Sequence, residues 1–274
     1  MLYYYANTGH KLGLERLRRG AALLNRLNAN GEETQLLVND FRAGLVAREL
    51  GVTEYVTIEG IQDIDAIAQN GDSIVIDSIE DDHGRLVKYC QDFDKVWRFS
   101  HDREDKSIHG EALIGTDIVM VDDTFFDETK KEERVLFFLG DADYDKTVLN
   151  NEDFFKTFDM ELLLGNYFFV KYEADLAKLF NTLHEPEEYE DLIKSTTTVV
   201  TASGQTAFEA KVAGANVIYI ALPERELYDR ALLEEYGISV VNGFDIQALQ
   251  TLLNSTQNKV MKLIQKIDIQ NILS

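Results

Sequence analysis

The chain has 274 residues, 45% of them hydrophobic, which suffices for one large core or two smaller ones. Its formal net charge of -22, from 49 acidic and 27 basic residues, disfavours nucleic acid and anionic membranes as partners, and its single cysteine, Cys90, excludes an intrachain disulfide and a cysteine-bound metal centre. No signal-peptide pattern opens the sequence and no apolar run reaches the roughly 20 residues of a membrane-spanning helix, so we expect a cytoplasmic protein without stable membrane association.

The first half of the sequence alternates short apolar runs with helical patterns. Strands are predicted over residues 2–6, 34–39, 72–79, 95–101 and 117–123, and helices over 14–27, 41–50 and 83–93. In the first of these helices the apolar residues recur with helical spacing, as Leu14, Leu17, Ala21, Leu24 and Leu27. Strands that alternate with helices imply βαβ units, in which a parallel sheet carries helices on both faces.

A charge run at residues 128–134, ETKKEER, contains no apolar residue and fits either a domain boundary or a solvated turn. The alternation restarts after it. Strands are predicted over residues 134–139, 160–165, 166–170, 196–202 and 216–222, and helices over 151–158, 175–183, 187–195, 206–215, 230–237, 245–253 and 258–267. We therefore predict two α/β domains, residues 1–130 and 131–274, with a cleft between them.

The stretch from Thr201 to Leu222, TASGQTAFEAKVAGANVIYIAL, reads as strand, tight loop, helix and strand. We expect Ser203, Gly204, Gln205 and Thr206 to form the loop. The helix behind it would present free N–H groups and the positive end of its dipole to a ligand beyond the carboxyl end of the strand. The competing interpretation is a capping box, in which Thr206 caps the helix and Glu209 reaches back to it.

Two further loops are candidates for ligand contacts. In LGDADYDK, residues 139–146, Gly140 would let backbone amides meet a phosphate, although aspartates after a strand are commonly turn formers. In ANTGHKLG, residues 6–13, His10 could act as a general base, or could be an inert surface histidine. His101, at the end of a predicted strand, could line the same cleft. The motifs of zincins, thiol redox enzymes, α/β-hydrolases, dinucleotide dehydrogenases and P-loop NTPases are absent.

The residues SGQTAFEAKVAGANVIYIAL resemble the S-x-x-x-x-E-A-x-x-x-G-x-P-x-I-x-I signature in the second domain of GT-B glycosyltransferase-like proteins. Within that group the chain is most similar to the UDP-sugar hydrolases of pseudaminic acid biosynthesis and to predicted spore-coat polysaccharide glycosyltransferases. The match covers roughly residues 133–242, and the N-terminal half matches mainly in the order of its elements.

The resemblance implies two Rossmann-like domains, the second of which holds a nucleotide diphosphate sugar, with uridine as the expected nucleoside and no metal or other cofactor. The residues implied to line the phosphates are Gly140, Ser203, Gly204, Gln205 and Thr206. Glu209 would bind the ribose. The implied function is a glycosyltransferase-like enzyme of surface-polysaccharide or flagellar-glycan biosynthesis, or a UDP-sugar hydrolase.

The first turn departs from the family pattern. The hydrolases carry G-x-G-H-x-x-R there, and aligning Gly13 and Arg19 to it puts Glu15 at the second glycine and Arg16 at the water-activating histidine. Aligning TGH to the transferase-type T-G-G-H turn makes His10 the matching histidine instead. The family's Asn-Gln pair after the last strand is replaced by residues 225 and 226, Arg-Glu.

Three hypotheses follow from these residues. The first is a GT-B enzyme in which His10 deprotonates an acceptor or water while helix-terminus amides stabilise the leaving diphosphate. The second is a non-catalytic relative that keeps the fold, which the missing motif histidine and the strong acidity favour. The third is an unrelated α/β protein whose helix cap imitates a nucleotide site, and it predicts one continuous sheet.

Overall fold

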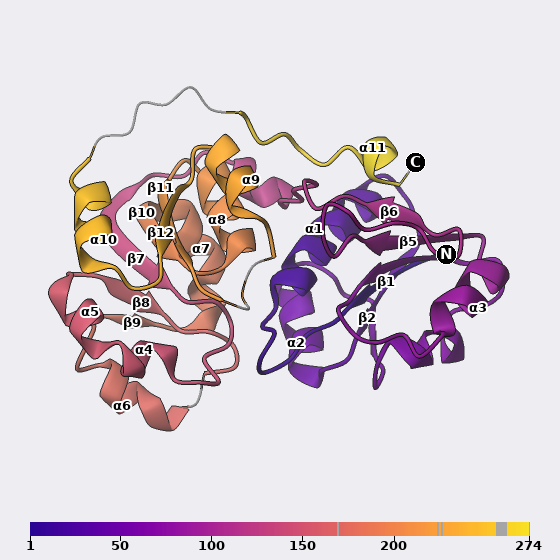
Figure 1. The fold of residues 1–274 in the computed structure, drawn as a ribbon, viewed down its shortest axis with the longest axis horizontal. Helices are drawn as coiled ribbons and strands as arrows, with labels where there is room; N and C mark the ends of the chain where they lie inside the picture. The colour runs from indigo at the N-terminus through magenta and orange to yellow at the C-terminus, as the bar shows by residue number, and fades with distance from the viewer. Residues whose placement is uncertain (169, 224, 226, 256–261, 274) are drawn as a thin grey trace. The chain divides into compact units, whose positions relative to one another are not determined.

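The computed structural model describes residues 1–168, 170–223, 225, 227–255 and 262–273. The chain divides into two compact units, neither of which is a single stretch of sequence. The first unit comprises Met1–Gly9, Arg16–Asp122 and Lys266–Ser274, and the second comprises His10–Glu15 and Asp123–Gln265. Each unit is built on its own six-stranded sheet with helices packed on it (Figure 1). The hypothesis of one continuous sheet is therefore wrong.

The sheet of the first unit is parallel throughout, with the strand order β3-β2-β1-β4-β5-β6. Its strands are β1 (Leu2–Ala6), β2 (Thr34–Val38), β3 (Tyr55–Thr57), β4 (Ser73–Asp77), β5 (Lys95–Phe99) and β6 (Ala112–Ile114). Its helices are α1 (Glu15–Ala29), whose first residue belongs to the second unit, α2 (Phe41–Glu49), α3 (Arg85–Asp92), α11 (Ile269–Ile272) and the 3-10 helix η1 (Ile61–Ala66). This is the strand order of doubly wound nucleotide-binding sheets.

Helix α1 packs closely on the central strand of the first unit. Gly20 faces that strand, and an added Cβ would lie 2.5 Å from the ring of Tyr4, so only glycine allows this approach. The buried runs of β1 and β4 are apolar on successive residues because both faces of these strands are covered. This covering explains why continuous apolar runs predicted the central strands.

The second unit repeats the topology of the first, with a parallel sheet in the order β12-β11-β10-β7-β8-β9. Its strands are β7 (Glu132–Phe138), β8 (Glu161–Leu163), β9 (Leu183–His184), β10 (Thr196–Thr201), β11 (Asn216–Ala221) and β12 (Ser239–Asn242). Its helices are α4 (Thr147–Asn150), α5 (Glu152–Thr157), α6 (Glu173–Leu176), α7 (Tyr189–Ser195), α8 (Gly204–Val212), α9 (Arg230–Glu235), α10 (Ile246–Leu253), and the 3-10 helices η2 (Asp123–Phe126), η3 (Val170–Tyr172) and η4 (Pro186–Glu188).

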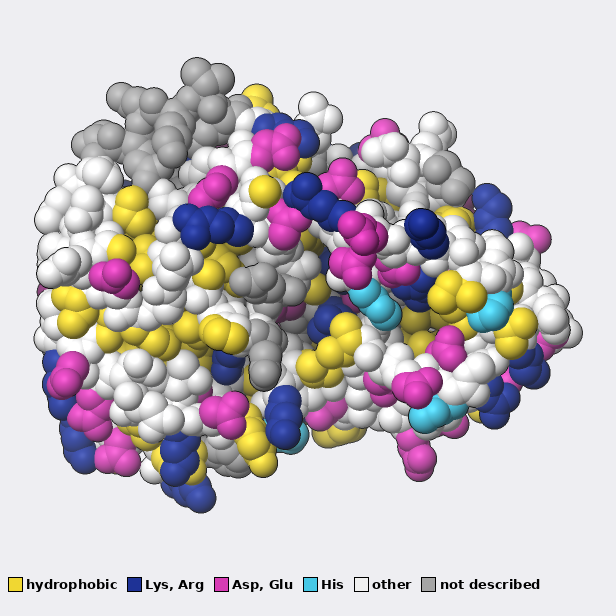
Figure 2. All heavy atoms as spheres, in the orientation of Figure 1, with side chains coloured by type: hydrophobic (Ala, Val, Ile, Leu, Met, Phe, Trp, Pro, Cys, Tyr) yellow, Lys and Arg dark blue, Asp and Glu magenta, His cyan; other side chains and the backbone are white. Residues whose placement is uncertain are grey.

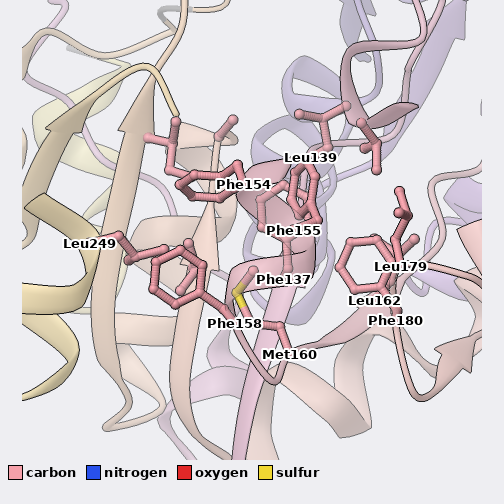
Figure 3. Close-up of a cluster of buried hydrophobic side chains, with 14 of the residues drawn as sticks. Phe137, Leu139, Phe154, Phe155, Phe158, Met160, Leu162, Leu179, Phe180 and Leu249 are labelled. Atoms are coloured by element: carbon pink, nitrogen blue, oxygen red, sulfur yellow. The ribbon is translucent and has the colours of Figure 1, made fainter. Parts of the chain in front are cut away.

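Five buried phenylalanines lie together in one core of the second unit (Figure 3). Phe155 from α5 is fully buried at its centre, and its ring centroid lies 4.8 Å from that of Phe137 on β7 and 5.2 Å from that of Phe180. Tilted and edge-to-face contacts of this kind add to the free energy gained by burying the rings. These contacts hold α5 against the second sheet, and the candidate site lies at the carboxyl edge of that sheet.

Several predicted elements differ from the structure. Residues 117–123 are not a strand, because the last strand of the first sheet is β6, which pairs with β5 and lies just before them. Residues 166 and 167 form a turn rather than a strand, and the predicted helix at 175–183 ends with α6 at Leu176. In the predicted helix at 258–267, residues 258–261 lie outside the described residues and 262–267 have no regular structure.

Charge on the surface is mixed. On the face shown in Figure 2, acidic and basic side chains are interspersed, so the excess of negative charge is not gathered in one patch there. In the part of the chain that the structure describes, no helix combines the length and apolarity needed to cross a bilayer.

Candidate functional site

Two loops of the second unit leave neighbouring strands at the same level. β7 pairs with β10 in parallel register, with Phe138 beside Thr201. Gly140 and Ser203 each lie two residues beyond these partners, at the carboxyl edge of the sheet. The same place is the switch point of the strand order, where ligands bind in open α/β sheets. The fold thus brings together the two loops that the sequence predicted to meet phosphates.

Helix α8 begins earlier than the sequence predicted. Ser203 is its N-cap, and the Ser203 Oγ accepts a hydrogen bond of 3.2 Å from the N–H of Thr206. Gly204, Gln205 and Thr206 are therefore the first residues of the helix rather than a loop. The predicted cap by Thr206 and Glu209 is wrong because Ser203, which has an extended backbone, takes that role.

A carboxylate of the chain itself is bound at the N-terminus of α8. Glu15 Oε1 accepts hydrogen bonds from the Ser203 hydroxyl at 2.9 Å and from the N–H of Gln205 at 3.0 Å. Glu15 ends the segment His10–Glu15, which belongs to the second unit. Unpaired N–H groups and the helix dipole favour a negative charge at this place. Sequence reasoning missed this contact because it joins residues 188 positions apart.

Glu209 lies further along α8 and has only 3% of its surface exposed. Its two carboxylate oxygens accept hydrogen bonds from the Tyr189 hydroxyl at 2.5 Å and from the Gln205 side-chain amide at 2.9 Å. The Tyr228 hydroxyl extends this network by donating to Gln205 Oε1 at 3.0 Å. A ribose hydroxyl would therefore compete with these protein donors for Glu209. Neither tyrosine lies in the sequence motif, so the motif gave no signal for the network.

The loop after β7, residues 139–146, is held by its own contacts. Gly140 has a φ of 122°, which residues with a Cβ rarely adopt. Gly165 packs against it so closely that an added Cβ would lie 2.5 Å from the Gly140 carbonyl oxygen. Asp143 accepts a hydrogen bond of 2.5 Å from the N–H of Thr147, and burial raises the pKa of its carboxyl group. This aspartate therefore serves the structure of the loop.

Arg225 brings a positive charge to the same loop. Its guanidinium donates to the Ala142 carbonyl oxygen at 2.9 Å and lies 3.8 Å from where a Cβ on Gly140 would stand. Arginine is the side chain best suited to phosphate oxygens, so this placement suits an anionic ligand. The sequence pointed to Arg225 only as a departure from the family pattern, and residue 226 of that pair lies outside the described residues.

His10, the predicted base, is exposed and packs its ring on Tyr167, with centroids 4.7 Å apart. Among the described residues no carboxylate or hydroxyl is hydrogen-bonded to its imidazole. A catalytic histidine is usually oriented by such a group, which selects the tautomer that accepts the proton. In this conformation His10 lacks that support.

A buried ion pair in the first unit ties α1 to the carboxyl end of β4. The Arg19 guanidinium donates two hydrogen bonds of 2.5 Å to the Asp77 carboxylate, which also accepts one of 2.7 Å from the Tyr4 hydroxyl. Arg16 lies 3.4 Å from the same carboxylate. In the register that matches the hydrolases, Arg16 stands where the water-activating histidine would be. A guanidinium remains protonated, so it cannot take a proton from water.

His101 follows β5 in the first unit and is held by a polar loop. The imidazole Nε2 lies 3.1 Å from the Ser78 carbonyl oxygen, and the backbone N–H of His101 donates to the Asp105 carboxylate at 2.8 Å. Asp105 in turn pairs with Arg98 at 2.6 Å, and Glu111 lies 3.4 Å from the same guanidinium. Among the described residues no group of three histidine, cysteine or acidic side chains is placed to hold a metal.

Because Asp105 is paired with Arg98 in this loop, we expect the stability of the first unit to fall at acidic pH. The hydrogen bond from Arg98 holds the pKa of the Asp105 carboxyl well below its usual range. A lowered pKa in the folded state stabilises the protein above the unfolded pKa, and that stability is lost as pH falls through the folded pKa, here from about pH 5 downward. We expect Asp105→Asn to lower the urea midpoint at pH 7 but to differ less from wild type as the pH approaches 3. An equal difference at both pH values would contradict this assignment.

Comparison with known proteins rests on structure, since the sequence matches no protein-family model and no curated protein at a significant level. The UDP-GlcNAc 2-epimerase of Methanocaldococcus jannaschii, solved with UDP-GlcNAc and UDP, aligns over 94% of both chains at 12% identity with a TM-score of 0.56. Spinosyn rhamnosyltransferase SpnG, solved with spinosyn aglycone, aligns over 93% of this chain and 92% of its own at 11% identity with a TM-score of 0.57.

Glycosyltransferase VinC, solved with dTDP, aligns over 92% of this chain and 91% of its own at 10% identity with a TM-score of 0.52. At such identities the likeness concerns the fold alone. The two parallel sheets with the same strand order and the near-complete alignments agree on that fold. The chain is an α/β protein of two Rossmann-like domains, of the GT-B type.

Proposed function

We propose that this chain binds a nucleoside diphosphate sugar at the carboxyl edge of the second sheet. The observation that carries the proposal is the anion seat at the N-terminus of α8, where the Ser203 hydroxyl and the Gln205 N–H already hold one carboxylate oxygen. Donors aimed in this way bind a phosphate oxygen equally well. The fold supports the proposal, because a nucleotide at this switch point is the commonest use of doubly wound sheets.

The surrounding residues take the roles that a nucleotide sugar requires. Arg225, beside Gly140, would neutralise the second phosphate. Glu209 would accept the ribose hydroxyls once the Tyr189 or Gln205 donor has been exchanged for them. Uridine as the nucleoside follows from the sequence resemblance, as does the nearest kinship to the pseudaminic acid hydrolases and spore-coat transferases.

The reaction we favour is glycosyl transfer in surface-polysaccharide or flagellar-glycan biosynthesis. The α8 amides would stabilise the leaving diphosphate, and His10 would deprotonate the acceptor hydroxyl. Hydrolysis of a UDP-sugar is the alternative, and the pairing of Arg16 with Asp77 argues against it in the hydrolase register.

A non-catalytic, nucleotide-binding role is a second candidate. It is favoured by the exposed His10 imidazole, which has no orienting hydrogen bond among the described residues. Release of UDP from UDP-N-acetylglucosamine, with and without candidate acceptors, separates the two roles. If His10 is the base, His10→Ala should slow turnover by about 10²–10⁴-fold. Unchanged turnover in His10→Ala would remove His10 from the mechanism, and no turnover with any acceptor would favour the binding role.

Titration calorimetry with UDP, GDP, CMP and UDP-N-acetylglucosamine tests the binding proposal. We expect saturable binding of UDP and of UDP-N-acetylglucosamine. Ser203→Ala removes one donor and should weaken UDP binding about 5–10-fold, since a hydrogen bond contributes about 1 kcal/mol net.

Loss of the Ser203 cap should also destabilise α8 by about 1 kcal/mol, so a matched control is needed. Asp245→Ala removes the cap of α10, where Asp245 accepts from the N–H of Ala248 at 3.0 Å, beyond a strand that lies two places from β10 in the sheet. It should cost similar stability without a change in UDP affinity. Absence of binding by all four ligands to the wild type would overturn the proposed function.

A further inference from the structure

The segment His10–Glu15 lies across the loops at the carboxyl edge of the second sheet, within the second unit. Lys11 places its ammonium 4.9 Å from the ring centroid of Tyr144 in the loop after β7. An added Cβ on Gly13 would lie 3.8 Å from the Cβ of Asp141 in the same loop. His10 packs on Tyr167 and Glu15 binds the start of α8, so the segment contacts the loops that follow β7, β8 and β10.

The contact at α8 has the chemistry of a bound phosphate. One negatively charged oxygen, Glu15 Oε1, takes both a side-chain hydroxyl and a backbone N–H at the start of the helix. The donors are sealed from solvent in this conformation, since Ser203 is 2% exposed and Gln205 and Thr206 are fully buried. A second anion cannot use the same two donors while Glu15 holds them.

We propose that Glu15 is an internal substitute for a ligand phosphate and that it limits the affinity of the chain for nucleoside diphosphates. The proposal rests on the proposed function of the same site. The hydrogen bonds of Glu15 and the binding of the diphosphate are mutually exclusive, because both need the Ser203 and Gln205 donors. A ligand must therefore displace the carboxylate, and like-charge repulsion prevents the two anions from sharing the seat.

Glu15→Ala tests the proposal directly. The variant empties the seat, so UDP should bind at least about tenfold more tightly than to wild type, which corresponds to about 1.4 kcal/mol. Glu15→Gln keeps an acceptor for both donors but loses the charge, so its affinity should fall between the two. Uridine has no phosphate and should bind all three proteins alike.

A matched control corrects for overall charge. Glu152 lies on α5 in the same unit and is paired with the exposed Lys156. Glu152→Ala changes the net charge by the same amount as Glu15→Ala, and should leave UDP affinity within about twofold of wild type because the charge is exposed and screened. Urea unfolding of each variant verifies that it is folded.

The outcomes separate the two proposals. Wild type that binds UDP while neither Glu15 variant binds it more tightly would overturn this inference and leave the proposed function standing. Weaker binding by Glu15→Ala would also overturn it, since Glu15 would then help to hold the ligand. Absence of UDP binding by wild type and both variants would overturn both proposals.

Discussion

Replacement of Asp77 by alanine is expected to destabilise the first unit by about 3–5 kcal/mol, the usual cost of removing one partner from a buried ion pair. The side chains of Asp77 and Arg19 are 1% and 7% exposed, and two hydrogen bonds join them. Without Asp77 the guanidinium, which also lies 3.7 Å from the centroid of the Phe99 ring, stays charged and buried. The hydrogen bond from the Tyr4 hydroxyl to Asp77 is also lost.

The single tryptophan makes this loss measurable in the first unit alone. Trp97 lies on β5 and is 4% exposed, so its fluorescence during urea unfolding reports on this sheet. Asp92→Ala serves as the control, because Asp92 pairs with Lys88 on the surface of α3 and its loss should cost about 0.5 kcal/mol or less. A cost below about 1 kcal/mol for Asp77→Ala would show that the pair exchanges freely with water.

Replacement of Glu209 by alanine should have the second-largest effect, about 2–4 kcal/mol of lost stability in the second unit. The change removes the carboxylate that accepts from the Tyr189 hydroxyl and from the Gln205 amide, and the loss of a buried hydrogen-bond partner costs about 1–3 kcal/mol. Hydrogen exchange of the α8 amides measures the effect where it arises.

Glu209→Gln separates the structural role of this residue from its predicted role toward ribose. Glutamine retains an acceptor for Tyr189, so the fold should survive with a loss of about 1 kcal/mol, while a charged acceptor for ribose hydroxyls is gone. UDP affinity should then fall about tenfold or more. Tyr189→Phe keeps the Glu209 carboxylate and removes a donor that competes with ribose for it, so UDP affinity should not fall. Equal affinities of wild type and Glu209→Gln would contradict the ribose role.

Local pattern predicted the two sheets better than it predicted the site. Central strands such as β4 and β11 are continuous apolar runs because both faces are covered, and such runs are visible in sequence. Edge strands are short and half-exposed, so β6 was missed and its place was given to residues 117–123. The competing interpretation placed the helix cap at Thr206. Ser203, three residues earlier, is also a residue type that caps helices, and only the backbone conformation shows that Ser203 is the cap.

Several decisive contacts of the site are long-range. Glu15 is the first residue of α1 and follows a turn that contains two glycines. An acidic residue at this position is commonly explained by its favourable interaction with the dipole of its own helix. The partners of Glu15 lie in another element far along the chain, and periodicity carries no information about such a pairing. The same holds for Tyr228, whose ring lies 3.1 Å from where a Cβ on Gly204 would stand.

The interleaving of the two units along the chain bears on how the protein is made. Residues 10–15 belong to the second unit although the rest of it begins at Asp123, and Ile267 and Ile272 are buried in the first. The first unit therefore lacks part of its core until residues near 272 have left the ribosome, which reverses the usual N-terminal-first order of domain completion. A gene cut near residue 122 would yield two fragments, each missing a piece that the other carries.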